Sequence, residues 1–328
     1  MKKKEYKVSI CVPIYGVEKY IERCATSIFE QTYTNIEYIF IDDCTPDNSI
    51  EILKSVIERY PKRKPHIKII KNERNCGLGA TRNTAINHAT GEFIMHVDSD
   101  DFVEKNIVEK LVIQQKISDA DIVTCGYILY RHNKIKEVLP EPIYNIKKLI
   151  SKILSRDATM MIWGRLIRKN LYDNNNIFVP EGINMGEDYV TIPKLFYYAK
   201  KIDFVKLPLY HYDCYNTGAY TTYVTENKIY QMLKCYDNLR NSFLDEKDYL
   251  ERIDIGELKY IANAMLNCFA NGNNLNNCCS ILSNRNVTSN KRLYKYVKLS
   301  NRVILYLKKA VLIKLYARTS SKISLLKK

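Results

Sequence analysis

Three carboxylates lie within four positions where an apolar run ends, in the stretch FIMHVDSDDF. Left unpaired, Asp98, Asp100 and Asp101 would repel one another, so they need a cation, hydrogen-bond donors or open water. Oxygen ligands at positions i and i+2 suit Mg²⁺ or Mn²⁺, which bind one or two carboxylates together with water and substrate phosphates. A second interpretation is structural: Ser99 and the acids after it could cap a helix that starts near Glu104.

The segment upstream of these acids, NCGLGATRN, adds a basic side chain. Gly77 and Gly79 open a predicted helix whose first turns carry Arg82, and this helix leads into the strand before the acids. The dinucleotide-binding pattern GxGxxG does not fit, because it needs glycine where Arg82 stands. A guanidinium close to a metal-bound diphosphate would donate a fork of hydrogen bonds to its oxygens. Arg82 could also form an internal ion pair with the acids, and both roles can hold together.

The elements that must position these residues alternate regularly through the first 125 residues. Predicted strands are VSICVPI (8–14), IEYIFI (36–41), IKII (67–70), EFIMHV (92–97) and DIVTCGYILY (121–130). Amphipathic segments near 18–31, 49–60, 79–89 and 104–116 predict helices between them. This alternation predicts an α/β fold with a mostly parallel twisted sheet and helices on both faces. Polar clusters follow the first, second and fourth strands, so we expect them at the carboxyl edge, where such sheets bind ligands.

Length and composition set the class of protein. The chain has 328 residues, of which 46% are hydrophobic and 27% charged, as in globular proteins with a main domain and an accessory part. No apolar run approaches ~18 residues, so we expect no membrane-spanning helix. The ten cysteines lack CxxC and zinc-binding spacings, which suggests reduced thiols in a cytosolic protein. Pro13 interrupts the N-terminal apolar stretch, which we interpret as a strand rather than a signal peptide.

The net charge of +15 is concentrated near the C-terminus, where residues 291–328 hold twelve Lys or Arg and no Asp or Glu. On a helical wheel the basic residues share one stripe and the apolar residues lie opposite. The basic stripe is Lys291, Lys295, Lys298, Arg302 and Lys309, and the apolar side is Leu299, Val303, Leu307, Ala310 and Val311. The pattern predicts a basic amphipathic helix, which either binds an anionic membrane surface or packs its apolar side on the protein body.

Several stretches in order resemble family 2 glycosyltransferases with the GT-A fold: SICVPIYGVEKYIERCATSIFEQTYTNIEYIFIDDCTPDNS, NCGLGATRN, HVDSDD and GED. The resemblance implies a GT-A catalytic and nucleotide-sugar-binding domain over residues 1–224, and a helical C-terminal region is expected over residues 225–328. It further implies a nucleotide-diphospho-sugar donor, which we expect to be a UDP-sugar, and a Mn²⁺ or Mg²⁺ cofactor. Transfer would go to an acceptor hydroxyl with inversion at the anomeric carbon.

The resemblance also implies roles for individual residues. Asp98 and Asp100 match the DxD motif, with Asp100 as the direct metal ligand and Asp98 nearer the ribose and sugar. Asp188 matches the general base of the ED pair, with Glu187 beside it as a second catalytic residue. The residues expected to bind the nucleotide sugar are Pro13, Tyr15, Glu18, Asp43, Arg82, Asp98, Ser99, Trp163 and Arg165. Among these, Pro13 and Tyr15 would lie against the nucleobase.

Some of these residues have structural alternatives. Asp43 matches the residue that hydrogen-bonds uracil, but it could instead form a turn. Glu187 and Asp188 could simply favour a helix start, where the macrodipole attracts acids. Arg165 stands where the family usually has Lys, which keeps the charge and changes its geometry. Residues 210–221 resemble the stretch that closes over the diphosphate, although Ala219 replaces a common Ser.

Two other classes of protein remain open at this level. A sugar-phosphate nucleotidyltransferase should carry a Gly-rich basic loop after the first strand, where this chain has PIYG (13–16). A nucleic-acid-binding protein would fit the net charge and the 26 tyrosines, but its charge should line a groove rather than a terminal helix. We therefore expect a glycan or lipid-linked acceptor and no nucleic acid. The expected location is cytoplasmic, peripheral on the inner face of the plasma membrane through residues 291–318.

Overall fold

The computed structural model describes residues 5–131, 134–216, 225–270 and 275–307. The chain forms two compact units, of which the first comprises residues 1–149 and 161–219 and the second comprises residues 150–160 and 220–328. The sequence placed the domain boundary at residue 224. Residues 150–160, which the sequence assigned to the first domain, belong to the second unit instead.

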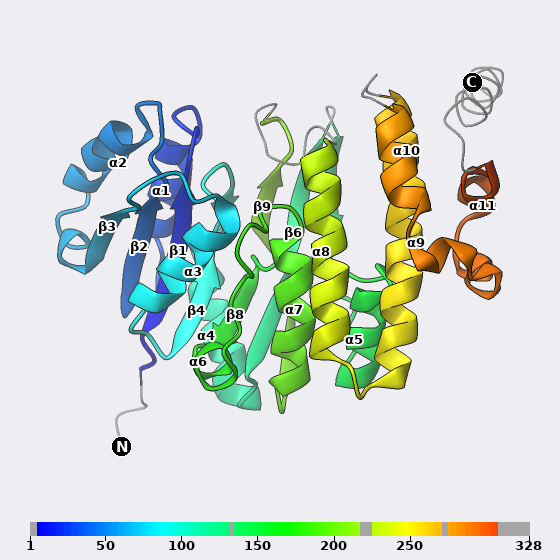
Figure 1. Cartoon of the computed structure of the whole chain (residues 1–328). Helices are drawn as coiled ribbons and strands as arrows, with labels where there is room; N and C mark the ends of the chain where they lie inside the picture. The colour runs from blue at the N-terminus through cyan, green and yellow to red at the C-terminus, as the bar shows by residue number, and fades with distance from the viewer. Residues whose placement is uncertain (1–4, 132–133, 217–224, 271–274, 308–328) are drawn as a thin grey trace. The chain divides into compact units, whose positions relative to one another are not determined.

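A mixed sheet forms the centre of the first unit (Figure 1), with strand order β3-β2-β1-β4-β8-β6-β9-β5 and with β7 paired to β6. The strands are β1 (Val8–Ile14), β2 (Ile36–Asp42), β3 (Ile67–Lys71), β4 (Phe93–His96), β5 (Phe102–Val103), β6 (Ile122–Arg131), β7 (Lys134–Val138), β8 (Arg165–Arg168) and β9 (Ile202–Asp213). All residues of β1, β2 and β4 are buried, as expected for parallel strands covered on both faces. The five predicted strands are confirmed to within a residue or two at their ends.

The expectation of a mostly parallel sheet is only partly right. Strands β1 to β4 pair in parallel, and so do β6 and β9. Strand β8 runs antiparallel between β4 and β6, and β5 and β7 also pair antiparallel. Strands β5 and β8 have only two and four residues, which is too short for a periodic pattern to predict them.

Helices cover this sheet on both faces. The helices of the first unit are α1 (Ile21–Phe29), α2 (Ser49–Glu58), α3 (Leu78–His88), α4 (Ile107–Ser118), α6 (Asn170–Asn175) and α7 (Glu187–Tyr198), with a 3-10 turn at Lys64–His66. Helix α5 (Ile146–Leu154) begins in the first unit and ends in the second. Helices α1, α2 and α4 share one apolar cluster with β1 and β2, whereas α3 contacts the same strands outside that cluster. Helix α4 begins at Ile107 with Asn106 as its N-cap residue. The acids after β4 therefore do not cap this helix, and that alternative is wrong.

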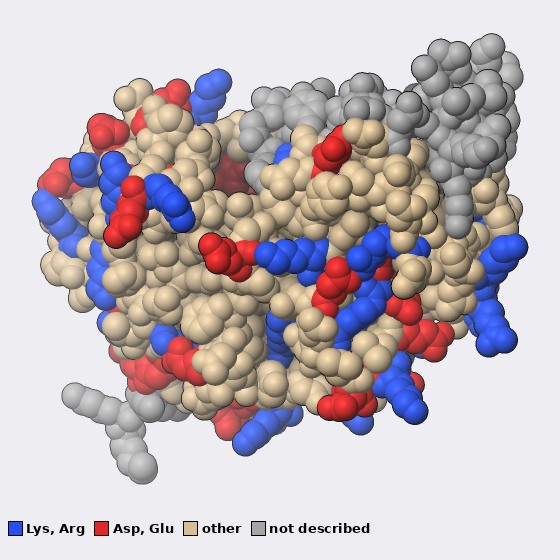
Figure 2. All heavy atoms as spheres, viewed as in Figure 1, with Lys and Arg blue, Asp and Glu red and all other residues tan. Residues whose placement is uncertain are grey.

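The second unit is helical, as the sequence predicts. Its elements are α8 (Glu226–Ser242), α9 (Lys247–Ala270), α10 (Leu275–Ser283), 3-10 turns at Asn286–Ser289 and Lys291–Tyr296, and α11 (Leu299–Leu307). A separate apolar core joins α8, α9, α10 and α11. Within the described residues, no helix is both long and apolar enough to cross a membrane. Basic and acidic side chains are interspersed over the face of the protein in Figure 2.

The single basic amphipathic helix predicted from residue 291 does not form in the described residues. A 3-10 turn ends at Tyr296, and Val297 has an extended backbone with φ −100° and ψ 143°. In the short helix that follows, Ile304 is fully buried while Leu299 is 75% exposed. The helical-wheel prediction was wrong because it assumed one continuous helix, at 100° per residue, across the extended residue Val297. Residues 308–328, including Lys309, Ala310 and Val311, lie outside the described residues.

Candidate active site

The loops after β1, β2 and β4 lie at one edge of the sheet because these strands are parallel and in register. Ile14 at the end of β1 pairs with Asp42 at the end of β2. Cys11 of β1 pairs with His96 at the end of β4. The polar clusters that follow the three strands are therefore gathered at this edge, as the sequence predicts.

The loop after β1 contributes an exposed aromatic ring. Tyr15 is 51% exposed, and Gly16, at φ +67°, donates its N–H to the Thr45 hydroxyl. Pro13 lies inside β1 and is buried, so it is not itself part of the loop. The Glu18 carboxylate accepts hydrogen bonds from the backbone and side-chain amides of Asn48, at 3.2 Å each. Of the three predicted residues, Tyr15 has the most accessible surface for a planar ligand.

Asp43, directly after β2, is nearly buried and holds the loop that leads into α3. One carboxylate oxygen accepts from the Cys76 N–H at 2.8 Å and from the Asn72 amide at 2.7 Å. The other accepts from the Gly77 N–H at 2.8 Å. Gly77 has φ +82°, and a Cβ there would collide with the side chain of Asn184, so glycine is required at this approach. Asp43 therefore has a structural role, and its oxygens have lone pairs left for a ligand.

Arg82 brings the two acidic motifs together. It projects from α3 and is 2% exposed. Its guanidinium forms a hydrogen-bonded ion pair with Asp98 at 2.9 Å. The same guanidinium lies 3.7 Å from the carboxylate of Glu187 and 3.9 Å from that of Asp188. The internal ion pair considered from the sequence is confirmed, and it extends to acids about a hundred residues further along the chain.

The second acidic motif opens α7. Gly186 precedes the helix at φ +90°, a conformation in which a side chain would be strained. One Asp188 oxygen accepts from the Ile162 N–H at 3.2 Å. The other, Oδ1, is buried, has no hydrogen-bond partner among the described residues and lies nearest to Arg82. This oxygen is withdrawn from solvent with its hydrogen-bonding capacity unused, so the carboxyl can hold a proton there.

The electrostatics of the site follow from several acids around the buried Arg82, while a second buried cation, Arg165, also acts on Asp188. Burial raises the pKa of Asp188, although the charge of Arg82 opposes the shift. Burial and the neighbouring Asp188 raise the pKa of Glu187. Burial and the charge of Asp98 raise the pKa of Asp100 to about 6. The site therefore favours ligands that bring positive charge or hydrogen-bond donors to the acids.

Strand β9 fixes the loop that carries the first motif. Asp101 is fully buried and accepts from the Tyr210 hydroxyl and from the Asp213 N–H, at 2.8 Å each. The Tyr210 oxygen in turn accepts from the Asp98 N–H at 3.1 Å. Asp100 accepts from the Asn216 amide at 2.9 Å. Residues 217–224, which follow directly and include Ala219, lie outside the described residues.

A further cation stabilises this arrangement from α1. Arg23 donates to the backbone oxygen of Asp100 at 2.9 Å and pairs with Asp213 at 2.7 Å. No role was predicted for Arg23. Tyr210, Asp213 and Asn216 were noted only within residues 210–221, which resemble the stretch that closes over the diphosphate, and Asp101 only as part of the acidic cluster. The third acid of DSDD was the one available signal, because a buried carboxylate requires donors from elsewhere in the chain.

Trp163, Arg165 and Ser99 support the site from within the fold. The Trp163 ring stacks on Tyr210 at 4.3 Å between centroids. Arg165 is 4% exposed and donates to the backbone oxygen of Met161 and to Thr124. Burial lowers the pKa of Arg165 to about 10. Ser99 is 6% exposed. These contacts are internal, so a direct role in ligand binding for the three residues stays a prediction.

The carboxylates of the site suit a divalent cation that takes some of its ligands from the protein and the others from a substrate. Within the described part of the chain, no group of three or more His, Cys, Asp or Glu side chains could hold a metal by itself. Asp100 nevertheless offers a half-buried carboxylate whose ionised form is disfavoured, and a cation beside it would relieve that cost. Mg²⁺ and Mn²⁺ typically use one or two carboxylates and complete their shell with phosphates and water.

Comparison with known proteins agrees with this arrangement. A structure of residues 1–349 of Staphylococcus aureus TarS in complex with UDP-GlcNAc superposes with TM-score 0.71 at 21% identity, over 96% of this chain and 92% of that one. The mannosyltransferase PcManGT from Pyrobaculum calidifontis, in complex with GDP-Man and Mn²⁺, gives TM-score 0.54 at 15% identity, over 96% and 88% of the two chains. The fold is therefore the GT-A fold.

Sequence comparison defines the family. The sequence model of Glycosyl transferase family 2 matches residues 9–180. The glycosyltransferase EpsJ of Bacillus subtilis is 33% identical over 214 residues, which cover 62% of this chain and 60% of that protein. The chain thus spans less than two thirds of this relative's length. This chain belongs to glycosyl transferase family 2. Family membership therefore decides against the two alternative classes left open by the sequence.

Proposed function

We propose that the protein transfers a sugar from a nucleotide-diphospho-sugar to a hydroxyl of a glycan or lipid-linked acceptor, with inversion at the anomeric carbon. The observation that carries this proposal is the position of Arg82, which pairs with Asp98 of the DxD motif and lies 3.9 Å from Asp188 of the ED pair. One guanidinium thus joins the residues expected to bind the donor to the residue expected to activate the acceptor.

Donor binding is assigned to the loops after β1, β2 and β4. The exposed ring of Tyr15 offers a face for the nucleobase, and Asp43 holds the adjacent loop with acceptor capacity left for a uracil N–H. A UDP-sugar is the proposed donor, and support comes from the UDP-GlcNAc complex of TarS. Arg82 and Asp98 are the residues proposed to position the ribose and the donor sugar.

A divalent cation, Mn²⁺ or Mg²⁺, is the proposed cofactor, with Asp100 as its ligand and Asp98 beside it. When bound, it would neutralise negative charge on the departing diphosphate, as a Lewis acid does in other transferases. The Asn216 amide donates to the Asp100 carboxylate and Arg23 donates to the Asp100 backbone oxygen, and these contacts would hold Asp100 for this role. Support also comes from PcManGT, whose structure contains Mn²⁺ together with GDP-Man.

Asp188 is the proposed general base. Its carboxylate would accept the acceptor hydroxyl proton while the new glycosidic bond forms and the nucleoside diphosphate leaves from the opposite face of the sugar. A positioned base of this kind contributes about 10² to 10⁴-fold to the rate. Glu187, whose pKa is raised by burial and by Asp188, retains its proton more readily and limits the negative charge around Arg82.

Nucleotide release from a panel of UDP- and GDP-sugars, measured with Mn²⁺ or Mg²⁺ and again with excess EDTA, tests the proposal. We expect one donor to be consumed in the presence of the metal and activity to disappear with EDTA. Full activity in EDTA would refute the role given to the metal. Failure to consume any nucleotide sugar, with and without candidate glycan acceptors, would refute the proposed activity.

A further inference from the structure

A hollow of about 520 Å³ lies in the helical second unit, between α8 and the end of α10. From α8 it is lined by Tyr230, Lys234 and Asp237, which share one helix face because they are four and three residues apart. Asn284 and Arg285, just after α10, line the other side. None of these residues takes part in the transfer site proposed above.

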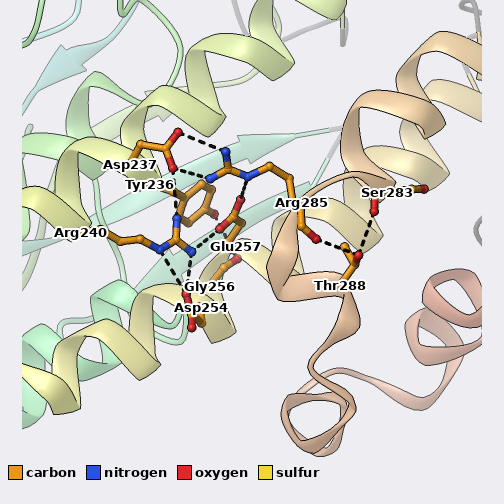
Figure 3. Close-up of polar contacts among 9 residues, drawn as sticks. All are labelled: Tyr236, Asp237, Arg240, Asp254, Gly256, Glu257, Ser283, Arg285 and Thr288. Atoms are coloured by element: carbon orange, nitrogen blue, oxygen red, sulfur yellow. Dashed lines mark hydrogen bonds and ion pairs between the residues drawn. The ribbon is translucent and has the colours of Figure 1, made fainter.

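Two charged groups of this hollow, Arg285 and Asp237, are fixed in place through a buried carboxylate (Figure 3). Glu257 of α9 is 1% exposed and accepts from the Arg285 Nε at 2.6 Å and from Arg240. The Arg285 guanidinium also pairs with Asp237. A buried carboxylate must keep its donors, since leaving it unpaired is strongly destabilising. Arg285 and Asp237 are therefore oriented before any ligand arrives, which lowers the entropic cost of binding.

The hollow combines hydrogen-bond donors, acceptors and an aromatic surface. Asp237, about half exposed, offers acceptor oxygens, and the Arg285 guanidinium, the Asn284 amide and the Ser280 hydroxyl offer donors. The Tyr230 ring is 55% exposed. A saccharide presents vicinal hydroxyls that both donate and accept, and C–H faces that pack on an aromatic ring. This lining matches such a ligand in each respect.

Charge argues against a phosphate group or a nucleic acid as the occupant. An ionised phosphate offers acceptors only, and it would face the Asp237 carboxylate at close range. The lining holds two cations, Lys234 and Arg285. The Arg285 guanidinium already faces two carboxylates, those of Glu257 and Asp237, so its charge is largely balanced. A neutral polyhydroxyl ligand has neither difficulty.

We propose that this hollow is a saccharide-binding site that holds a sugar unit of the acceptor glycan. The proposal rests on the proposed function, because it takes the acceptor to be a glycan. It adds a second point of attachment for that glycan, made by α8 and the end of α10, and so assigns acceptor affinity to the helical unit as well as to the catalytic one.

Saturation-transfer NMR on the full chain, without donor, tests the site. The probes are methyl glycosides of N-acetylglucosamine, glucose, galactose and mannose, the matching trisaccharides, and inorganic phosphate as a comparison. We expect at least one saccharide to bind the unaltered protein. Tyr230→Ala and Asn284→Ala should each weaken that binding about 5-fold or more, as expected for loss of one ring contact or one hydrogen-bonded group. Both side chains are exposed and lie outside the Glu257 ion pairs, so neither change should unfold the protein.

Two controls separate this proposal from the proposed function. Tyr306→Ala, which removes another exposed tyrosine of the same unit (60% exposed), should leave saccharide binding unchanged. Asp188→Asn should lower transfer by about 10² to 10⁴-fold and leave this binding unchanged. The site is refuted if no saccharide binds, if binding survives both α8–α10 variants, or if phosphate alone binds in a manner that depends on Tyr230. Donor consumption with metal would still support the transferase activity in each of those cases.

Discussion

Arg82 is the residue on which the charge of the candidate active site depends. A single buried guanidinium faces Asp98, Glu187 and Asp188, so the acids outnumber the cation that holds them. Burial alone would lower the pKa of Arg82, but the surrounding carboxylates raise it further above its usual range. Arg82 is therefore permanently charged, and adjustment of charge in the site must come from the acids or from a bound cation.

Asp188→Asn tests the base at the residue scale. Asparagine keeps the shape of the side chain and its contact with the Ile162 N–H, but it cannot accept the acceptor proton. We expect the turnover number to fall by about 10² to 10⁴-fold while the dissociation constant for the donor changes little. Calorimetry for binding and a coupled nucleotide-release assay for turnover provide the two measurements.

The matched control is Asp173→Asn, which neutralises a half-exposed acid of the first unit whose partner is Lys169. It should leave both quantities unchanged. Near-normal turnover in Asp188→Asn would show that another group takes the proton.

The pH dependence of transfer is a second prediction at this scale. Burial raises the pKa of Asp188 from its usual value near 4 to about 6. A carboxyl whose pKa is raised is protonated below that value and cannot act as a base, so kcat should fall as the pH drops through about 6. A profile at saturating donor and metal measures this. Activity that stays constant down to about pH 4.5 would contradict the assignment.

At the scale of elements, the end of β9 determines the geometry of the DxD loop. Tyr210→Phe removes the hydroxyl that donates to Asp101 and accepts from the Asp98 N–H. We expect binding of UDP with Mn²⁺ to weaken about 10-fold, because the loop loses the two hydrogen bonds that position it. We also expect the free energy of unfolding to fall by roughly 1–3 kcal/mol. Calorimetry and urea denaturation measure the two effects.

Tyr38→Phe is the control for this change. Tyr38 is also fully buried in the sheet, and its hydroxyl has no hydrogen-bond partner among the described residues. Its removal should leave UDP binding unchanged and cost less stability. Equal UDP affinity in Tyr210→Phe and the unaltered protein would show that β9 does not position the metal-binding loop.

Strand β2 contributes a carboxylate whose role is stability. Glu37 is 2% exposed and accepts hydrogen bonds from Ser9, Thr90 and Gly91 while pairing with Lys7. Burial alone would raise its pKa, but these donors lower it from 4.5 to about 2. A lowered carboxyl pKa stabilises the fold above about pH 4.5, and this contribution of roughly 3 kcal/mol is lost as the pH falls toward 2.

Glu37→Gln removes that titration. Urea denaturation between about pH 5 and pH 2 should therefore show a shallower loss of stability in this variant than in the unaltered protein. Glu58→Gln, at an exposed acid paired with Lys64, should leave the slope as it is. Identical slopes in the Glu37 variant and the unaltered protein would contradict the assignment.

At the scale of the whole molecule, the net charge of +15 is unevenly distributed along the chain, with twelve basic and no acidic residues in 291–328. The extended residue Val297 breaks the predicted helix, but the charge remains. We propose that this C-terminal segment attracts the protein to anionic membranes, each basic residue near the surface contributing about 1 kcal/mol. A glycosyltransferase with lipid-linked acceptors would then work at the membrane surface.

Flotation with liposomes of phosphatidylglycerol and phosphatidylcholine tests this attraction. The full chain should float with anionic liposomes at low salt, and less at high salt, because screening weakens surface charge interactions. Replacing the basic residues of 308–328 by glutamine should reduce flotation, while neutral liposomes serve as the matched control. Equal flotation of the unaltered chain and the glutamine variant would refute the proposal.

The sequence by itself determined the alternating elements of the first unit and the ends of its strands, because a buried strand is a run of apolar residues and its carboxyl end is marked by polar ones. It therefore predicted Asp43 and Asp98 at one edge, since parallel strands in sequence end together. Only the tertiary structure decided which distant groups meet there. Tyr210 and Asp101 are 109 positions apart, and no periodic pattern links such residues. Burial makes these pairings selective, because a carboxylate withdrawn from water must find donors wherever the fold supplies them.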